Sequence, residues 1–378
     1  MVGLGNAQRW DIFCRIIDNY GDIGVCWRLA RQLQQEHGAH VRLWVDNLQV
    51  AQRLIPAIQP ELSSQFVDQI EISLWEACFP ETVPADVVIE AFACDIPQTY
   101  LAAMADSKPV WLNLEYLSAE SWVREFHLKP SPHARLPLTK YFYFPGFSAE
   151  TGGLLREHGL TAARATFQAS AEMQAAFCQR LGIDDLGLKV SLFCYPHAAI
   201  DALLDDMATS SSRVHCLISD PKLAAVAEGW LGQALAIGEV VTKGSLSLQR
   251  LPFLSQQDYD RLLWLCALNF VRGEDSWLRA IWAARPFVWQ PYRQEEETHL
   301  AKLEAFLDVY AGSLADDAKQ LLCDTHRAWA EGRWRAGDID LLQAKSGELQ
   351  AHAVDVSQGL ASQPDLVTKL VIFCKNLF

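Results

Sequence analysis

Hydrophobic and polar positions along the chain alternate between the period of buried strands and that of amphipathic helices. Trp10–Ile17 is an apolar run of β-favouring residues, and Val25–Gln35 then carries Val25, Leu29 and Leu33 on one helical stripe. Further strands are predicted over His40–Val45, Ile70–Leu74, Val87–Glu90 and Val110–Leu114, and helices over Leu48–Ile55 and Ile96–Ala103. This order predicts an α/β fold in which helices cover a parallel sheet.

The composition of the chain changes over Glu115–Phe147, which is rich in proline and aromatic residues and has mixed charges. We expect a functional loop region here, with aromatic side chains forming a wall of a partner-binding cleft. A packed surface excursion without a binding role is the alternative.

The strand and helix pattern starts again after a helix predicted over Ala162–Leu181 and a turn at Gly182–Leu186. Strands are then predicted over Gly187–Tyr195, Arg213–Ser219, Leu246–Leu254, Leu268–Val271 and Phe287–Gln290, and helices over His197–Met207, Lys222–Leu235, Gln256–Ala267 and Ser276–Ala284. We therefore expect two Rossmann-like domains, 1–182 and 183–360, that face each other across a cleft in a GT-B fold. The segment 361–378 is expected to form a C-terminal helix that crosses back onto the first domain.

Composition and charge narrow the class of protein. Half of the 378 residues are hydrophobic, which suits two globular cores, and the net charge of −14 argues against non-specific nucleic-acid binding. The ten cysteines are scattered without a C-x-x-C pair, as expected of buried thiols in a reducing compartment. The sequence has neither an apolar signal region nor a run of about 18 apolar residues. We expect a soluble, cytoplasmic protein that does not contact membranes.

The loop between the first strand and the first helix, Asp18–Gly24, is the first candidate site. A glycine-bearing loop that runs from a strand into a helix is a common place for nucleotide-type ligands in α/β sheets. Asp18 and Asp22 add two carboxylates, which a bare phosphate cradle does not favour. The acids suggest a base, or a group that binds a cation, beside the ligand.

The run Arg272–Ser276 is the second candidate site, because it links a strand end to a helix start. A helix N-terminus binds phosphate through its exposed N–H groups, Arg272 can add a bidentate contact, and Gly273 lets the backbone approach a ligand. Capping of the helix by Glu274, Asp275 and Ser276 is the alternative.

Aromatic and polar residues near the same strand ends extend this second site. Phe193 and Tyr195 end the first strand of the second half, where their rings can stack on a base or can simply fill the core. Ser255 and Asp258 form a near capping box, so a helix is predicted to begin at about Gln256, and an ordinary capped helix is the simplest explanation of that motif.

Five stretches closely resemble the EarP family, the protein-arginine rhamnosyltransferases of elongation factor P. They are WDIFCRIIDNYGDIGVCWRLARQL, NLEYLSAESWV, LFCYP, LPFLSQQDYDRLLW and NFVRGEDSWLRAIWA. The resemblance implies a GT-B enzyme that transfers rhamnose from dTDP-β-L-rhamnose to one arginine of elongation factor P, with inversion. It also implies that the modified factor rescues ribosomes stalled at polyproline, and that the first domain holds this partner.

The resemblance carries site roles onto matching positions of this sequence. Asp22 matches the general base, Glu274 a second essential acid, and Asp18 a further acid needed for activity. Donor contacts match Asn19, Tyr20, Gly21, Asp22, Phe193, Tyr195, Phe253, Gln256, Arg272, Gly273, Glu274, Asp275 and Ser276.

The chemistry of the implied reaction suits these residues. A guanidinium has a pKa above about 12, so a carboxylate cannot simply deprotonate it in the free state. We expect Asp22, helped by Asp18 or Glu115, to grip and polarise the acceptor arginine while the helix start at Ser276 and Arg272 neutralise the departing phosphates. No cofactor and no metal are expected, because no D-x-D pair stands where a diphosphate-bound metal would lie.

Two other functions compete with this interpretation. A GT-B transferase for a small or lipid-linked glycan would be expected to carry a basic or amphipathic membrane-facing patch, which the charge of −14 disfavours. A non-enzymatic nucleotide-sugar-binding protein would have little use for acids in both ligand loops.

Overall fold

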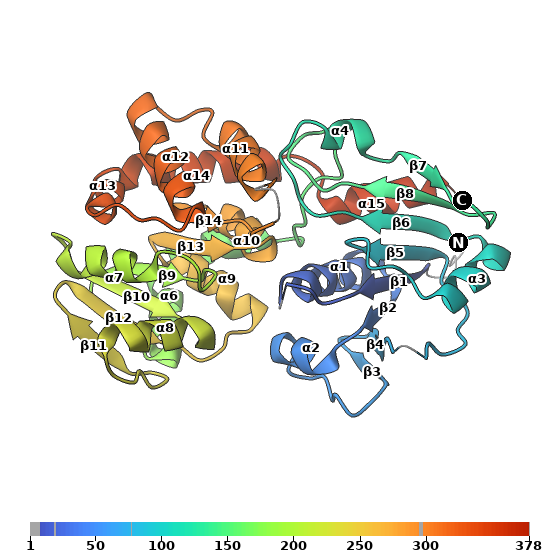
Figure 1. Cartoon of the computed structure of the whole chain (residues 1–378), viewed down its shortest axis with the longest axis horizontal. Coiled ribbons are helices and arrows are strands. Elements are labelled where there is room, and N and C mark those ends of the chain that lie inside the picture. Colours follow the sequence, from blue (N-terminus) through green and yellow to red (C-terminus); the bar gives the residue numbers. More distant parts are fainter. Residues whose placement is uncertain (1–7, 19, 77, 295–297, 378) are drawn as a thin grey trace. The chain divides into compact units, whose positions relative to one another are not determined.

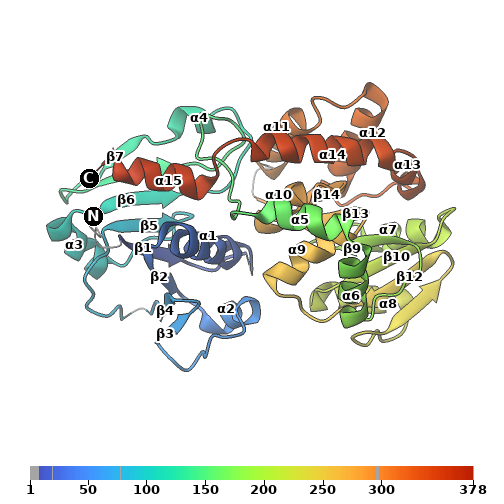
Figure 2. The same ribbon diagram turned by 180° about the vertical axis from the view of Figure 1, so that it is seen from behind.

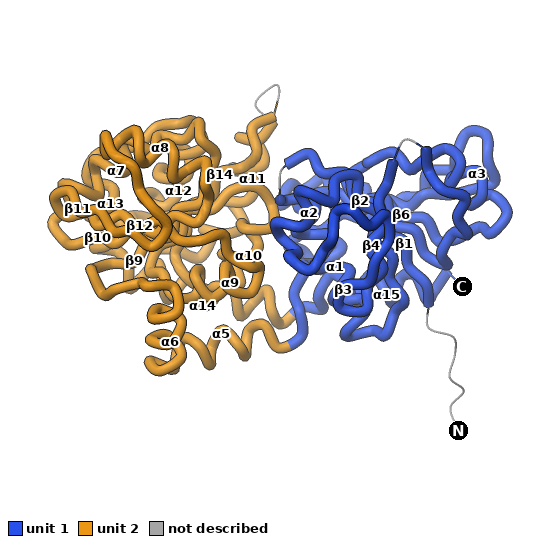
Figure 3. Tube along the Cα trace, turned by 90° about the horizontal axis from the view of Figure 1, so that it is seen from below, with its two compact units in different colours: residues 1–158, 363–378 blue, residues 159–362 orange. Residues whose placement is uncertain are grey.

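The chain forms two compact units in the computed structural model, which describes residues 8–18, 20–76, 78–294 and 298–377. Unit 1 comprises residues 1–158 and 363–378, and unit 2 comprises residues 159–362 (Figure 3). Within the described part of the chain, every helix is too short or too polar to cross a lipid bilayer.

Unit 1 is built on an eight-stranded sheet with the order β3-β4-β2-β1-β5-β6-β8-β7 (Figure 1). The strands are β1 (Arg9–Cys14), β2 (His40–Val45), β3 (Ser64–Val67), β4 (Ile70–Leu74), β5 (Val87–Ala91), β6 (Val110–Leu114), β7 (Pro130–Pro132) and β8 (Thr139–Tyr143). The six inner strands are parallel, and the edge strands β3 and β7 are antiparallel to their neighbours. β5 and β6 are buried at every position, as expected of parallel strands covered on both faces.

Five helices accompany this sheet: α1 (Gly21–His37), α2 (Leu48–Leu54), α3 (Gln98–Ser107), α4 (Val123–Phe126) and α15 (Leu366–Lys375). The C-terminal helix α15 belongs to unit 1, where it contacts α1 (Figure 2). Gln32 of α1 donates a hydrogen bond to Asp365 over 3.0 Å, and the Tyr143 hydroxyl lies 3.3 Å from the Leu366 carbonyl oxygen. These contacts tie the last helix to the first one and to the sheet.

Unit 2 contains a six-stranded sheet with the order β11-β12-β10-β9-β13-β14, parallel except for the edge strand β11. Its strands are β9 (Leu188–Leu192), β10 (Val214–Ile218), β11 (Val240–Lys243), β12 (Leu246–Arg250), β13 (Leu268–Arg272) and β14 (Phe287–Gln290). Its helices are α5 (Leu160–Ala169), α6 (Ala171–Leu181), α7 (Ile200–Thr209), α8 (Pro221–Leu231), α9 (Gln256–Leu265), α10 (Asp275–Ala283), α11 (Thr298–Tyr310), α12 (Asp316–Ala330), α13 (Asp338–Ala344) and α14 (Ser346–Ala361).

Two sequence expectations differ from this architecture. The helix predicted over Ala162–Leu181 is two helices, because Ser170 leaves the helical conformation and caps α6 by accepting a hydrogen bond from the Met173 amide. Both helices belong to unit 2, so the units divide between residues 158 and 159, not at the predicted boundary of 182. The expected loop region over Glu115–Phe147 contains α4, β7 and β8 as well as irregular chain.

In each sheet, the strand order reverses at one inner strand. In unit 1 the chain leaves β1 between β2 and β5, and in unit 2 it leaves β9 between β10 and β13. At such points the loops that follow the strands diverge to opposite faces of the sheet, which opens a crevice at the carboxyl ends. Asp18–Asp22 follow β1, while Phe193 and Tyr195 follow β9 and Arg272 ends β13. The topology therefore places both candidate sites at switch points.

Candidate functional site

The carboxylate of Asp22 is the best-defined group of the unit 1 site. It lies in the first turn of α1 and is 2% exposed. Its Oδ2 accepts hydrogen bonds from the backbone amides of Ile17, at 2.8 Å, and Asp18, at 2.9 Å, and its Oδ1 accepts one from the Tyr116 hydroxyl at 3.1 Å. All of these donors are neutral, so they fix the carboxylate without cancelling its charge.

Further contacts hold the other described residues of the loop that precedes Asp22. Asp18 is half-buried, and its carbonyl oxygen accepts a hydrogen bond from the Gly21 amide at 2.7 Å. A Cβ at position 21 would lie 3.2 Å from Asp18 Oδ2, so glycine lets the Asp18 carboxylate sit against the helix start. The Tyr20 hydroxyl lies 3.3 Å from a guanidinium nitrogen of Arg53. Asn19, a predicted donor contact, lies outside the described residues.

Glu115, the predicted helper acid, follows β6 and is half-buried. The side-chain amide of Asn113 donates a hydrogen bond to its Oε1, so Asn113, which is fully buried, orients this acid. Two strands of one sheet thus present Asp22 and Glu115 at their carboxyl ends.

Arg272 is the centre of the unit 2 site, and it is 6% exposed. Its guanidinium carbon lies 4.3 Å from the centre of the Phe193 ring and 4.8 Å from that of Tyr195. Nη1 donates to the Cys194 carbonyl oxygen at 2.8 Å, and Nη2 lies 3.2 Å from Asp220 Oδ2. The guanidinium therefore holds both rings in place, and the phosphate contact expected of Arg272 stays a prediction.

The loop Arg272–Ser276 is fixed from the neighbouring strand. Gly273 has φ +61°, a conformation that favours glycine; its amide donates to the Gln290 carbonyl oxygen at 3.1 Å, and its own carbonyl accepts from Trp289 Nε1 at 2.7 Å. The Ser276 hydroxyl accepts a hydrogen bond from the Arg272 amide at 3.1 Å and donates to the Arg272 carbonyl oxygen. Ser276 thus closes the turn, while Glu274 stands at the N-cap and makes no capping hydrogen bond with its side chain.

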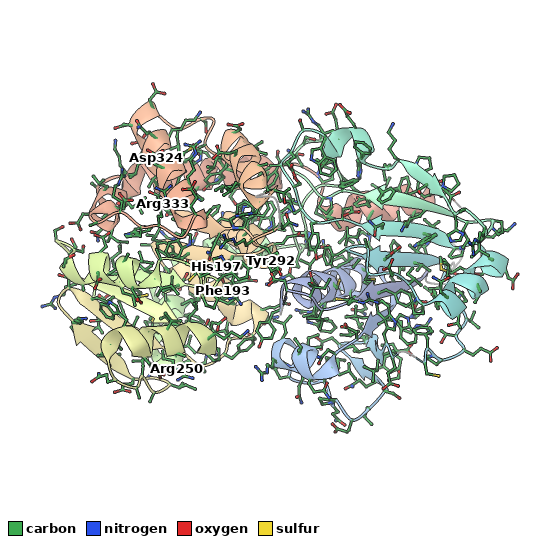
Figure 4. All side chains as sticks on the ribbon, in the orientation of Figure 1. Phe193, His197, Arg250, Tyr292, Asp324 and Arg333 are labelled. Carbon is green, nitrogen blue, oxygen red and sulfur yellow. The ribbon has the colours of Figure 1, made fainter. Side chains whose placement is uncertain are left out.

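Further aromatic side chains surround Tyr195. Figure 4 labels Phe193 and His197, which follow β9, and Tyr292, which follows β14. His197 stacks on Tyr195 with ring centres 5.6 Å apart, and the centre of the Tyr292 ring lies 5.7 Å from that of Tyr195. The cluster forms a partly exposed aromatic surface of the kind on which a nucleobase stacks.

Phe253 and Gln256 lie in the connection from β12 to α9. Phe253 is 41% exposed, and Gln256 is the first residue of α9, where Ser255 caps the helix by accepting a hydrogen bond from the Asp258 amide at 3.2 Å. The predicted capping motif is therefore present. The exposed ring of Phe253 stands at the end of the sheet that carries the other candidate residues.

Cysteines near these loops are not candidate nucleophiles. A hydrogen bond with Cys26, burial and the negative charge of Asp22 raise the pKa of Cys14, and burial raises the pKa of Cys194. Both groups therefore stay protonated thiols at neutral pH. The chemistry open to the site rests on its carboxylates.

The structure also adds three contacts that the sequence did not reveal. Tyr116 orients Asp22, Asp220 holds Arg272, and Gln290 accepts a hydrogen bond from the Tyr195 amide at 2.8 Å. Each lies on a different element from its partner, so no local sequence pattern links them. Among the described residues, no three His, Cys, Asp or Glu side chains are grouped so as to hold a metal ion, and the absence of a metal from the reaction stays a prediction.

Two Rossmann-like units with candidate ligand loops at their switch points are typical of one class of protein. The solved structure of MurG from Acinetobacter baumannii matches with a TM-score of 0.53 over 98% of this chain and 99% of that one, at 12% sequence identity. The spinosyn forosaminyltransferase SpnP matches with a TM-score of 0.50 at 10% identity, over 98% of this chain and 99% of that one. Such similarity shows the fold alone: this protein has the GT-B fold of glycosyltransferases.

Its family follows from closer matches. Residues 10–375 match the sequence model of the family described as elongation factor P (EF-P) rhamnosyltransferase EarP. The chain belongs to the EarP family and is a glycosyltransferase.

Individual relatives agree with this assignment. The chain is 47% identical to a protein-arginine rhamnosyltransferase of Pseudomonas putida over 97% of its own length and 98% of the relative's, and 39% identical to one of Shewanella oneidensis over the whole of both chains. A solved structure that concerns EarP-mediated arginine glycosylation of translation elongation factor EF-P matches with a TM-score of 0.71 and 36% identity, over 98% of this chain and 100% of that one.

Proposed function

We propose that this enzyme transfers L-rhamnose from dTDP-β-L-rhamnose to an arginine side chain of elongation factor P, with inversion at the anomeric carbon. Membership of the EarP family and the names of the full-length relatives support this proposal. An acceptor that works on the ribosome implies a cytoplasmic enzyme that has no membrane or nucleic-acid ligand of its own. The modified factor would then act on ribosomes stalled at polyproline.

One observation carries the proposal: Asp22 is a buried carboxylate that is oriented by neutral donors at a switch point. Inversion by a single displacement needs one base on the acceptor side and no covalent intermediate. A carboxylate whose charge is not cancelled by a cation suits a guanidinium acceptor, because the two charges attract each other.

The proposed transfer is a single displacement at C1 of rhamnose. A guanidinium nitrogen of the acceptor attacks C1 of rhamnose and forms the C–N bond, and the bond from C1 to the diphosphate oxygen breaks, so dTDP leaves with the electron pair. The proton of the attacking nitrogen passes to Asp22 as the bond forms. Asp18 and Glu115 help to hold the guanidinium, since a carboxylate acts on so weak an acid only when charge shifts in the transition state.

Unit 2 holds the donor in this proposal. Phe193, Tyr195 and Phe253 receive the thymine and deoxyribose, while Gly273–Ser276, with Arg272, stabilise the diphosphate at the start of α10. Glu274 acts as a second acid that orients the sugar or shapes the diphosphate site. The Gln256 side chain at the start of α9 completes the donor contacts.

Asp22→Asn tests the base directly. We expect the variant to bind dTDP-rhamnose as the wild type does but to lose transfer, because the amide keeps the shape and cannot take a proton. Donor binding is measured by calorimetry, and transfer by intact mass of purified elongation factor P, where the wild type adds one deoxyhexose. Near-normal turnover by Asp22→Asn would refute the base assignment.

Asp86→Asn is the matched control for loss of a carboxylate in the same unit. Asp86 pairs with Arg9 at 2.9 Å, beside the amino end of β5 and away from the carboxyl ends, so its replacement should leave transfer intact. If the wild type added no mass to elongation factor P, the proposed acceptor would be wrong. A glycan acceptor would then be the alternative.

A further inference from the structure

The two oxygens of the Asp22 carboxylate have different surroundings. Oδ2 receives two backbone amides, those of Ile17 and Asp18, which occupy both of its lone pairs. Among the described residues, Oδ1 receives the Tyr116 hydroxyl at 3.1 Å and no second donor, which leaves one lone pair for another hydrogen. Oδ1 is therefore the oxygen suited to receive a proton, and Tyr116 determines the direction in which its remaining lone pair points.

The ring of Tyr116 is itself held by a second aromatic side chain. It stacks on Phe92 with ring centres 4.2 Å apart and an interplanar angle of 12°. Phe92 directly follows β5 and is 8% exposed, so it is a fixed partner rather than a mobile surface ring. The stack joins the ends of two neighbouring strands, β5 and β6, to the helix start that carries Asp22.

The backbone under Phe92 is strained. Phe92 has φ +57°, and Ala93 and Asp95 have φ +52° and +58°, in the left-handed region that bulky L-residues rarely occupy. The turn is held by hydrogen bonds from the Phe92 amide to the Leu114 carbonyl at 2.7 Å and from the Ala93 amide to Asn113 Oδ1 at 3.0 Å. Strain that is maintained by surrounding bonds commonly serves a site.

We propose that Tyr116 is a positioning residue for the general base, held in place by the strained Phe92 turn, and that its hydroxyl fixes which lone pair of Asp22 Oδ1 meets the acceptor. The inference rests on the proposed function, because it needs Asp22 to be the base. Asn113 has a related role, because the same side chain bonds the Ala93 amide and the Glu115 carboxylate and so orients the turn and the helper acid together.

Tyr116→Phe is the direct test, because it keeps the ring and its stack and removes only the hydroxyl. We expect kcat to fall by about 10-fold to 100-fold, the loss expected for one hydrogen bond to a charged group. KM for dTDP-rhamnose should stay within about twofold, because Tyr116→Phe replaces none of the predicted donor contacts.

Phe92→Leu tests the stack without touching the hydroxyl. We expect a smaller fall in kcat than in Tyr116→Phe, because the ring loses its support but keeps its hydrogen-bonding group. The double variant should be no slower than Tyr116→Phe alone if both side chains act through the same hydrogen bond. Independent, multiplying losses in the double variant would show that Phe92 does not act through Tyr116.

Tyr100→Phe is the matched control. The Tyr100 hydroxyl also donates to a buried aspartate of unit 1, Asp11 on β1, so this variant removes an equivalent bond away from the loop. It should lower the melting temperature without lowering kcat. A Tyr116→Phe enzyme with wild-type kcat would overturn the inference while leaving Asp22 as the base. A wild type without transfer activity would overturn both.

Discussion

At the scale of single residues, the buried carboxylates differ in whether their partner is a cation or a neutral donor. Asp11 pairs with Arg42 at 2.7 Å, and Asp220 lies 3.2 Å from Arg272, so a cation balances each charge. Within the described residues, the hydrogen-bond donors to Asp22 are neutral. A carboxylate without a cationic partner attracts a cation, and the function proposed above uses Asp22 in this way.

Asp220→Asn should weaken donor binding although Asp220 is not itself a predicted donor contact. Asparagine keeps the N-cap of α8, where Asp220 accepts a hydrogen bond from the Lys222 amide at 2.7 Å, but leaves the buried Arg272 without its countercharge. We expect the affinity for dTDP, measured by calorimetry, to fall about 10-fold and the free energy of unfolding to fall by roughly 3 kcal/mol.

The control for this prediction is Asp260→Asn, which breaks an equally buried pair with Arg279 at 2.7 Å in the same unit. It should lower stability by a similar amount and leave dTDP affinity unchanged. Equal losses of affinity in the two variants would mean that the donor site responds to general destabilisation and not to Arg272.

His127 makes unit 1 sensitive to acid. Burial, with the nearby cation Lys369, lowers the pKa of His127 to about 4, and its neutral Nδ1 accepts a hydrogen bond from the Phe144 amide at 3.1 Å. Between about pH 6.5 and about pH 4 the unfolded chain binds a proton that the folded chain does not, so folding stability rises with pH and is lost as the pH falls through this window.

We expect a loss of about 1 to 2 kcal/mol from His127 between about pH 7 and about pH 4.5, allowing for its partial exposure. Urea unfolding at a series of pH values measures it. His127→Gln should be less stable than the wild type at neutral pH but should show a shallower slope below about pH 6.5. An unchanged slope would assign the acid sensitivity to other groups.

At the scale of elements, α15 shows how a terminal helix is held. Asp365 caps it by accepting hydrogen bonds from the Thr368 amide at 3.0 Å and the Thr368 hydroxyl at 2.6 Å, and Gln32 of α1 donates to the same carboxylate. The Asp365 side chain thus provides both the cap of α15 and the contact with α1. Loss of this residue should release the helix from both.

Asp365→Ala should lower the free energy of unfolding by about 1 to 2 kcal/mol, the usual value of a cap, and expose residues 363–378 to proteolysis. Asp365→Asn should retain most of the stability, because an amide oxygen caps nearly as well. Chemical unfolding and limited proteolysis followed by mass spectrometry measure both effects. An alanine variant as resistant as the wild type would show that apolar packing of α15 suffices.

Elements could be predicted from the sequence where burial alone determines the pattern. Most inner parallel strands were located from their apolar residues, and β14, an edge strand buried at every position, was predicted at its observed bounds, Phe287–Gln290. The inner strand β8 was missed, because it is mostly half-buried and lies in the region predicted as a loop. The edge strands β3, β7 and β11 were missed, because half-exposed strands carry polar residues or proline and resemble loops. The break at Ser170 was missed, because the apolar pattern that predicted one helix does not show where a serine caps a second one.

The candidate site also has parts that could be predicted from the sequence and parts that could not. Loops at strand ends could be found from glycines and charges next to apolar runs, so the Asp18–Asp22 and Arg272–Ser276 segments were predicted. The partners of these groups could not be found, because Tyr116 is 94 residues from Asp22 and its hydrogen bond exists only in the folded sheet. The same separation hides Asp220 from Arg272 and Asn113 from the Phe92 turn.

At the scale of the whole molecule, the division of the chain has a consequence for its synthesis. Unit 1 takes residues 1–158 from the start of the chain and residues 363–378 from the end, and all of unit 2 lies between them. A ribosome therefore releases every residue of unit 2 before α15 exists. The N-terminal part waits through residues 159–362 with the surface that α15 will cover still exposed. A nascent chain can thus complete unit 2 before it completes unit 1.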